Sequence, residues 1–559
     1  MSDSKYYADI HSHPSMKPYY SSLEDKDKKN MWEFLPERAA CNTLKENAHR
    51  FLEKKMCLAV DDMAKYSQMN FESCQKGQIR LVFSSLYPVE RGWFKLRDLA
   101  DWLSDDKFIT QSSICSSGFH PQVIRKIEDH INKHKPINYF HELVGEYHYL
   151  TSAQAQSNHA QQQFVLVNDY QQLRDVLNDH NQNKIALILN IEGGHSLNQF
   201  RNYHDLSNTP FRKVNKKRKP LYKYYRDIYF EHIDIIKGLS QATIKQGGEE
   251  VLVSFQHTPF YLTLAHHFWN LLCGHADSFQ WSADLVLKQG RGKNRGFTAL
   301  GKTVLHRLLH RNAAERRILI DIKHLSIRSR IDFYQIWEEY HKEGDSFPII
   351  CSHTAVNGRE GYQAFGIADE EKNHSIYQMF NSSDINMFDY DIQMVHRSKG
   401  LIGIMLSSSR LPGDESQERI KKAIKKMKRH PELKPSLNKK IKREHIRNIT
   451  ANVFHIIRLG VDNSAWDRIS IGSDFDGMIT SLLNYEKAEQ YPLLADDLTA
   501  FLIECPGIEE MDMDASEMRS LMQGYQAHEI VDKLMRKNAL DFARRYFHDG
   551  FLKFGEIGL

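Results

Sequence analysis

Short apolar runs recur along this chain, and longer polar or amphipathic stretches separate them. Each run is rich in β-branched and aliphatic residues and is continuously apolar, which is typical of parallel strands buried on both faces. Eight such runs predict strands at 6–11, 78–86, 185–191, 261–265, 318–322, 348–351, 401–406 and 469–472. Several stretches between them have helical periodicity, for example 299–311 and 327–341. This alternation predicts an α/β fold, a (β/α)8 TIM barrel with helical insertions.

The length of 559 residues is large for one domain, but a barrel with insertions can exceed ~400 residues. We therefore expect a single catalytic barrel domain over 1–559, with insertions at 14–75, 197–250 and 410–450. Two insertions carry basic runs, RKVNKKRK at 212–219 and KKAIKKMKRHPELKPSLNKKIKRE at 421–444. These runs either bind an anionic partner or form a solvated helical surface. The second interpretation is favoured, because acidic residues elsewhere balance the charge.

The overall charge gives little reason to expect a polyanionic partner. Lys and Arg total 75 against 71 Asp and Glu, a formal net charge of +4, so neither nucleic acid nor an anionic membrane is expected. The seven cysteines are scattered without a C-x-x-C pair, which argues against a disulfide framework and favours a reducing compartment. The sequence begins without a signal-peptide pattern and has no apolar run of ~18–20 residues, so a soluble cytoplasmic protein is expected.

Residues that commonly bind metals or transfer protons follow most of the predicted strands. In a (β/α) barrel the carboxyl ends of all strands meet at one mouth, so these residues would converge although they are far apart in sequence. Two histidines end the first strand in an H-x-H pattern, and side chains two apart on a strand face the same side. The complete set is His11, His13, Glu192, His266, His324, His353 and Asp474.

This set predicts a site for two divalent ions. His11 and His13 would hold one ion, His324 and His353 the other, and the two oxygens of Glu192 would bridge them. Nitrogen-rich ligands with a carboxylate favour zinc, while manganese, cobalt and iron stay open. Two ions roughly 3.5–4 Å apart would trap a hydroxide between them. Asp474 would then take the proton of the attacking water and pass it to the leaving group.

Each of these residues also has a simpler interpretation, because a single histidine at a strand end is more often a core or loop residue. The number of such residues at one predicted mouth favours the metal site. His306 and His310 lack the glutamate of an H-E-x-x-H motif, and the glycines of QGRGKNRG (289–296) match no nucleotide-binding pattern. A serine nucleophile has no support, because no G-x-S-x-G motif occurs.

Several motifs resemble the membrane (renal-type) dipeptidase family of the amidohydrolase superfamily. The resemblance extends from residue 6 to about 547, interrupted by the insertions, and IEGGHS and IGSDFDG are its most specific parts. It implies a dipeptidase in which Glu192 bridges two zinc ions, Asp474 is the acid-base and His266 stabilises the oxyanion. The motifs are DIHSHP (9–14), NIEGGHSL (190–197), YLTLAHH (261–267), GFTALGKTVL (296–305), ILIDIKHLS (318–326), PIICSHTA (348–355), GLIGIML (400–406), RISIGSDFDG (468–477) and the helix IVDKLMRKNALDFARRYF (530–547).

Two positions depart from that family. His13 stands where the family usually has an aspartate, which makes the ligand set less anionic. Ile385 stands where the resemblance expects the arginine that binds the substrate carboxylate, so Arg359 or another basic group would have to replace it.

We therefore expect a metal-dependent hydrolase that cleaves an amide bond of a small-molecule substrate, a dipeptide or a related amide. One alternative keeps both ions but changes the substrate to an N-acyl amino acid, a lactone or a cyclic amide. A one-metal deaminase-like amidohydrolase and a non-catalytic metal-binding scaffold are further alternatives. The sequence leaves the oligomeric state open, including a homo-oligomer.

Overall fold

The structure is a computed structural model of the chain. It describes residues 6–24, 30–34, 67–95, 106–156, 163–179, 184–246, 248–279, 289–361, 378–460 and 462–554, together with scattered positions between 41 and 60 and with Leu287. No helix in the described parts is both long and apolar enough to cross a bilayer.

A barrel of eight parallel strands forms the centre of the molecule, and each strand coincides with one of the predicted apolar runs. Neighbouring strands pair in sequence order around the barrel. The predicted TIM-barrel fold is therefore confirmed. The strands are β1 (Tyr7–Ser12), β2 (Ile79–Leu86), β5 (Ile185–Glu192), β9 (Tyr261–Thr263), β10 (Leu319–Asp321), β11 (Ile350–Thr354), β12 (Leu401–Ile404) and β13 (Ile469–Ile471).

The barrel closes where the end of β1 meets the segment after β13. The backbone N–H of Asp474 donates to the carbonyl of His11 at 3.0 Å, and that of His13 donates to the carbonyl of Phe475 at 2.9 Å. These two bonds place the residues that follow β13 directly beside the H-x-H pattern. A ninth strand, β4 (Phe164–Leu166), extends the sheet on the amino-terminal half of β5.

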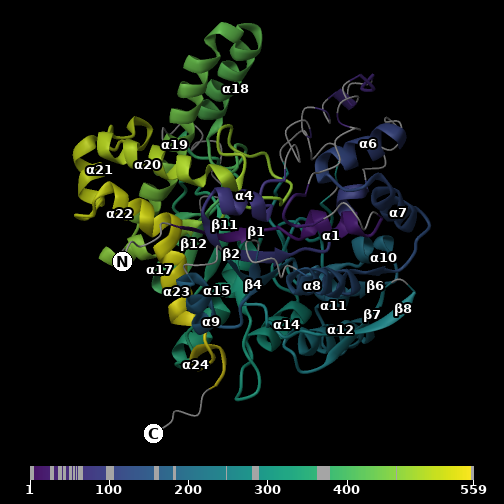
Figure 1. Cartoon of the computed structure of the whole chain (residues 1–559). Helices are drawn as coiled ribbons and strands as arrows, with labels where there is room; N and C mark the ends of the chain where they lie inside the picture. Colours follow the sequence, from purple (N-terminus) through teal and green to yellow (C-terminus); the bar gives the residue numbers. More distant parts are fainter. Residues whose placement is uncertain are drawn as a thin grey trace.

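Helices surround the barrel and cover the outer faces of its strands (Figure 1). Apolar side chains from the strands and from these helices form one continuous core. The helices that contact barrel strands include α9 (Tyr170–Asn178), α14 (Ala299–Leu309), α17 (Asp389–Arg397), α19 (Lys434–Arg458) and α23 (Asn538–Tyr546). Further helices are α6 (Asp106–Ser117), α7 (Pro121–Asn132), α8 (Tyr139–Gln156), α15 (Ile327–Lys342), α20 (Tyr491–Glu504), α21 (Ala515–Leu521), α22 (Ala527–Asp532) and α24 (Asp549–Leu552).

The three stretches predicted as insertions contain additional elements. Residues 14–75 include α1 (Met16–Ser22) and α4 (Phe71–Lys76), and 410–450 include α18 (Asp414–Arg429) and most of α19. In Figure 1, α18 extends away from the barrel, whereas the carboxyl-terminal half of α19 is buried. The elements of 197–250 include β6 (Gln199–Phe200), α10 (Tyr203–Asn208), α11 (Phe211–Val214), α12 (Pro220–Ile236) and the hairpin of β7 (Gln241–Gln246) and β8 (Glu249–Ser254).

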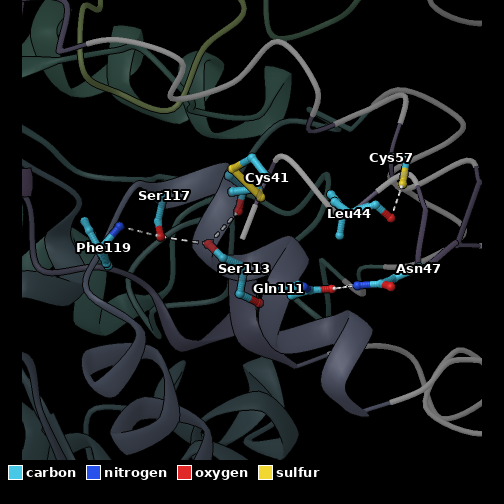
Figure 2. The surroundings of a disulfide bond; sticks show 10 residues. Cys41, Leu44, Asn47, Cys57, Gln111, Ser113, Ser117 and Phe119 are labelled. Carbon is cyan, nitrogen blue, oxygen red and sulfur yellow. Dashed lines mark hydrogen bonds between the residues drawn. A yellow bond between two sulfur atoms is a disulfide. The ribbon is translucent and has the colours of Figure 1, made fainter. Parts of the chain in front are cut away.

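One disulfide bond joins Cys41 to Cys115 in α6 (Figure 2), with their Cα atoms 5.3 Å apart. A hydrogen bond of 2.9 Å from Asn47 to Gln111 connects the same two segments. The other five cysteines are free and buried. The scattered cysteines argued against a disulfide framework and did not reveal this single pair. Its partners are 74 residues apart in sequence, and no local motif reveals such a pairing.

Candidate metal centre

The seven side chains singled out from the sequence lie together at the carboxyl-terminal mouth of the barrel. All are buried, with 0% to 7% of their surface exposed. Three belong to the strands themselves, since His11 lies in β1, Glu192 ends β5 and His353 lies in β11. The other four, His13, His266, His324 and Asp474, follow the strands β1, β9, β10 and β13 within a few residues.

Glu192 lies at the centre of this cluster, and its two carboxylate oxygens face different histidines. Oε2 is 2.9 Å from Nε2 of His13 and 3.6 Å from Nε2 of His11. Oε1 is 3.2 Å from Nε2 of His324 and 3.6 Å from Nε2 of His353. Each oxygen of one carboxylate therefore serves a separate pair of imidazoles, which is the arrangement needed to bridge two cations.

Asp474 also contacts both halves of the cluster. Its Oδ1 lies 3.7 Å from Nε2 of His13 and 3.9 Å from Nε2 of His11, and its Oδ2 lies 3.9 Å from Nε2 of His353. Two carboxylates thus border the space between the histidines. One group of potential ligand atoms comprises His11, His13, Glu192 and Asp474, and a second comprises Glu192, His324 and His353, with all atoms of each group within 4.8 Å of one another.

The hydrogen bonds of the first-strand histidines fix which ring nitrogen faces the cluster. Nδ1 of His13 lies 2.9 Å from the backbone carbonyl of Ser85, which can only accept, so this nitrogen carries the proton. Nδ1 of His11 lies 3.2 Å from the hydroxyl of Tyr261, and that hydroxyl already donates to the carbonyl of Ile10. In His13 the proton therefore lies on Nδ1, and Nε2 offers a lone pair to the cluster. In His11 the hydroxyls of Tyr261 and Ser85 both contact Nδ1, and Nε2 again faces Glu192.

The same logic applies to His353. Its Nδ1 lies 2.9 Å from the hydroxyl of Ser352, and this hydroxyl donates to Asp321 at 2.6 Å. The Nε2 atoms of His353 and His324 are only 3.2 Å apart. Two lone pairs this close repel each other unless a proton or a cation lies between them.

The residues present therefore fit divalent cations. Nε2 of His11, Nε2 of His13 and Oε1 of Glu192 are buried and make no hydrogen bond of standard geometry with the described residues, although Nε2 of His13 lies 2.9 Å from Oε2 of Glu192. Buried polar atoms without a partner are costly and rare, and an ion is one of the standard explanations for them. Imidazole nitrogen with carboxylate oxygen is the donor set that zinc and related metals prefer.

Two of the seven residues have left-handed backbone conformations that residues other than glycine rarely adopt. The φ angle is 65° at His324 and 62° at Asp474. Such conformations cost on the order of 1–3 kcal/mol each and are concentrated at functional sites. The backbone is thus strained where it turns these two side chains into the barrel mouth.

The electrostatics of the protein groups favour positive charge at this position. Burial lowers the pKa of His13, but the neighbouring Glu192 carboxylate outweighs it and raises that pKa to about 9. Burial, reinforced by Glu192, raises the pKa of Asp474 to about 6. Although burial acts in the opposite direction, His266 and His11 hold the pKa of Glu192 well below its usual range. A group of ligands that binds a proton this strongly also attracts a metal cation, which would displace that proton.

Glu90 is a participant that the sequence analysis missed. Its Oε2 lies 2.5 Å from Nδ1 of His266 and accepts the backbone N–H of His267 at 3.2 Å. Its Oε1 accepts the backbone N–H of Phe268 at 3.1 Å and lies 3.8 Å from Nδ1 of His195. Glu90 therefore fixes both the ring of His266 and the backbone that carries it. Glu90 lies four residues after the end of β2. The sequence analysis had found no candidate site residue at the end of this strand.

Comparisons with known proteins find similarity among solved structures only. No protein-family profile matches the chain, and no curated protein matches it. Among solved structures it is similar to a metallopeptidase from Rhodobacter sphaeroides liganded with a phosphinate mimic of the dipeptide L-Ala-D-Ala, with 11% identity, a TM-score of 0.44, and coverage of 97% of this chain and 99% of that one. A probable dipeptidase from Pseudomonas aeruginosa has 12% identity, a TM-score of 0.39, and coverage of 85% and 88%.

Proposed function

We propose that this protein is a binuclear metal-dependent hydrolase that cleaves an amide bond of a small substrate, in the manner of a dipeptidase. The observation that carries the proposal is the position of Glu192, whose two oxygens face two separate pairs of imidazole nitrogens. A single carboxylate placed this way is difficult to explain by packing alone, because burying a carboxylate among imidazoles requires a compensating charge.

The chain's residues divide into two ligand sets that share Glu192. His11 and His13 would hold one ion, with Asp474 beside them, and His324 and His353 would hold the other. When bound, two such cations polarise a carbonyl group and lower the pKa of a water molecule toward neutrality. We propose zinc as the native metal, because imidazoles make up two of the three donors other than Glu192 in the first set and both of them in the second.

Asp474 is the group best placed to transfer a proton. It is buried beside both histidine pairs, and its raised pKa of about 6 means that it can both accept and return a proton near neutral pH. In the proposed reaction it accepts the proton of the attacking water and delivers it to the nitrogen of the departing amine.

His266 is suited to stabilise the negative charge that develops on the carbonyl oxygen. Burial lowers the pKa of His266, but the carboxylates of Glu90 and Glu192 outweigh it, and the net effect raises that pKa. Nδ1 of His266 lies 2.5 Å from Glu90, so its Nε2 faces the cluster, 3.7 Å from Oε1 of Glu192, where a protonated ring would present an N–H. Because this donor is already in position before the reaction, the protein does not have to reorganise around the developing negative charge.

Metal content and activity together test the proposal. Protein purified without chelator is expected to contain two equivalents of divalent metal per chain by elemental analysis. Removing the metal with a chelator is expected to abolish hydrolysis of L-alanyl-L-alanine, and zinc is expected to restore it. One equivalent per chain would contradict the bridging role of Glu192. Two equivalents of metal without hydrolysis of any dipeptide, acylated amino acid or lactone would instead favour a metal-binding scaffold protein without catalytic activity.

Glu90 provides a test of the role of His266. Glu90→Gln keeps the size of the side chain but removes the charge that stabilises protonated His266. We expect kcat to fall by about 10- to 100-fold while metal content stays at the wild-type value. The exposed Glu432 gives a matched control, since Glu432→Gln should change neither quantity. Loss of metal in Glu90→Gln would show that Glu90 supports the ligands and not the oxyanion.

A further inference from the structure

Two cationic side chains lie beside the candidate metal centre without an anionic partner. The first is Lys323, which immediately precedes His324 and is only 2% exposed. Its ammonium nitrogen is buried and makes no hydrogen bond to any described residue. Lys323 lies in the turn directly after β10, and its backbone N–H donates to Oδ1 of Asp321 at 3.0 Å. There Lys323 interacts electrostatically with Asp474.

The second is Arg410, in the segment that follows β12. Its Nη2 donates to the backbone carbonyl of Ser278, and this is its one hydrogen bond from the guanidinium to a described residue. No described carboxylate pairs with it within 4.0 Å, although Asp384, Asp474 and Asp277 attract it from farther away. Most N–H groups of the Arg410 guanidinium therefore have no hydrogen-bond acceptor among the described residues and can donate to a ligand.

Arg410 and Lys323 both lie at the carboxyl-terminal mouth of the barrel. The Arg410 guanidinium acts electrostatically on Lys323 and on His267. His267 follows His266 directly, and its ring stands 4.7 Å from that of His324. The Ser278 residue that accepts from Arg410 also bonds through its hydroxyl to Nδ1 of His267, at 2.6 Å. This network fixes Arg410 next to the cluster.

A buried, unpaired lysine ammonium next to a second, partly buried cation is unfavourable by itself. The ammonium of Lys323 has lost its hydration, and repulsion by the guanidinium of Arg410 adds to that cost. An arrangement of this kind persists when an anion that is part of the function binds between them. Arginine offers a planar pair of donors that matches a carboxylate, and lysine adds a point charge.

We propose that Arg410 and Lys323 form the subsite that binds the free carboxylate of the substrate. The inference rests on the proposed function and extends it, because it assigns the substrate class: an amide whose leaving or acyl part carries a carboxylate, as dipeptides and N-acyl amino acids do. Lactones and cyclic amides without such a group would lack this interaction. The subsite also accounts for Ile385, which is buried and apolar and cannot bind an anion.

The test compares L-alanyl-L-alanine with L-alanyl-L-alaninamide, which differ only in the terminal carboxylate. The zinc-loaded wild-type protein is expected to prefer the acid by at least about 100-fold in kcat/KM. Arg410→Gln and Lys323→Met should each lower kcat/KM for the acid by roughly 30-fold or more and leave the value for the amide nearly unchanged. Arg410→Lys should recover part of the preference. Arg429→Gln, in the exposed last turn of α18, is the matched control and should behave as wild type.

A binding measurement separates this inference from the proposed function. N-acetyl-L-alanine should raise the melting temperature of the zinc-loaded wild type, N-acetyl-L-alaninamide should not, and Arg410→Gln should remove the difference. If the protein hydrolyses neither dipeptide, the proposed function fails while this shift still decides the subsite. Equal stabilisation by acid and amide, or equal loss of activity toward both dipeptides in Arg410→Gln, would overturn the subsite.

Discussion

Glu192→Gln is expected to bind at most one equivalent of metal and to lose activity by about 1,000-fold or more. The glutamine keeps the shape of the side chain, but one of its two ends becomes an NH2 group that can only donate. Since Oε1 faces His324 and His353 and Oε2 faces His11 and His13, whichever end carries the NH2 deprives one histidine pair of its shared anion. Losing the several kcal/mol that a second cation supplies to the transition state corresponds to the stated factor.

The matched control is a buried glutamate outside the site. Glu315 is 4% exposed, lies between α14 and β10, and pairs with Lys237 and Arg307. Glu315→Gln should lower the melting temperature but keep the metal content of the wild type. Elemental analysis and kcat/KM measured on both variants separate loss of the bridge from general destabilisation. Two full equivalents of metal in Glu192→Gln would remove the bridging role.

The barrel and the convergence of its site residues could be predicted because both depend on local patterns. Continuous apolar runs identify buried parallel strands, and in this topology the residue that follows each strand points to the same mouth. Glu192 and His353 are therefore neighbours although 161 positions separate them in the sequence. The seven residues needed no knowledge of helix packing, since each lies in a strand or within three residues of its end.

The remaining parts of the site could not be predicted, because they depend on loops. Glu90 contacts His266 only because the segment after β2 folds over the one after β9. Arg410 likewise reaches the mouth through its bond to Ser278 in a distant segment. Nothing in the periodicity of the sequence determines how these loops pack. The Cys41 to Cys115 pairing has the same origin, since it connects two segments outside the barrel strands.

A scaffold without catalytic activity explains less of the structure than a hydrolase does. Metal binding alone would account for the buried nitrogens of His11 and His13, but it requires neither the strained backbone at Asp474 nor the fixed orientation of His266 by Glu90. It also leaves Lys323 without a reason to be buried unpaired beside the cluster. Proton transfer, oxyanion stabilisation and substrate binding give each of these groups a role.

Asp474→Asn distinguishes these roles most directly, and its expected result is a 100- to 10,000-fold loss of kcat with both metal equivalents retained. Asparagine keeps an oxygen that can face His11 and His13, but it cannot accept and return a proton. If Asp474 acts chiefly as a ligand, metal content should fall in step with activity, because its oxygens lie within 3.9 Å of three histidine nitrogens. Asp497→Asn, which changes a partly buried carboxylate that pairs with Lys442, controls for the loss of a charge. Full activity in Asp474→Asn would assign the proton transfer to another group and contradict the mechanism.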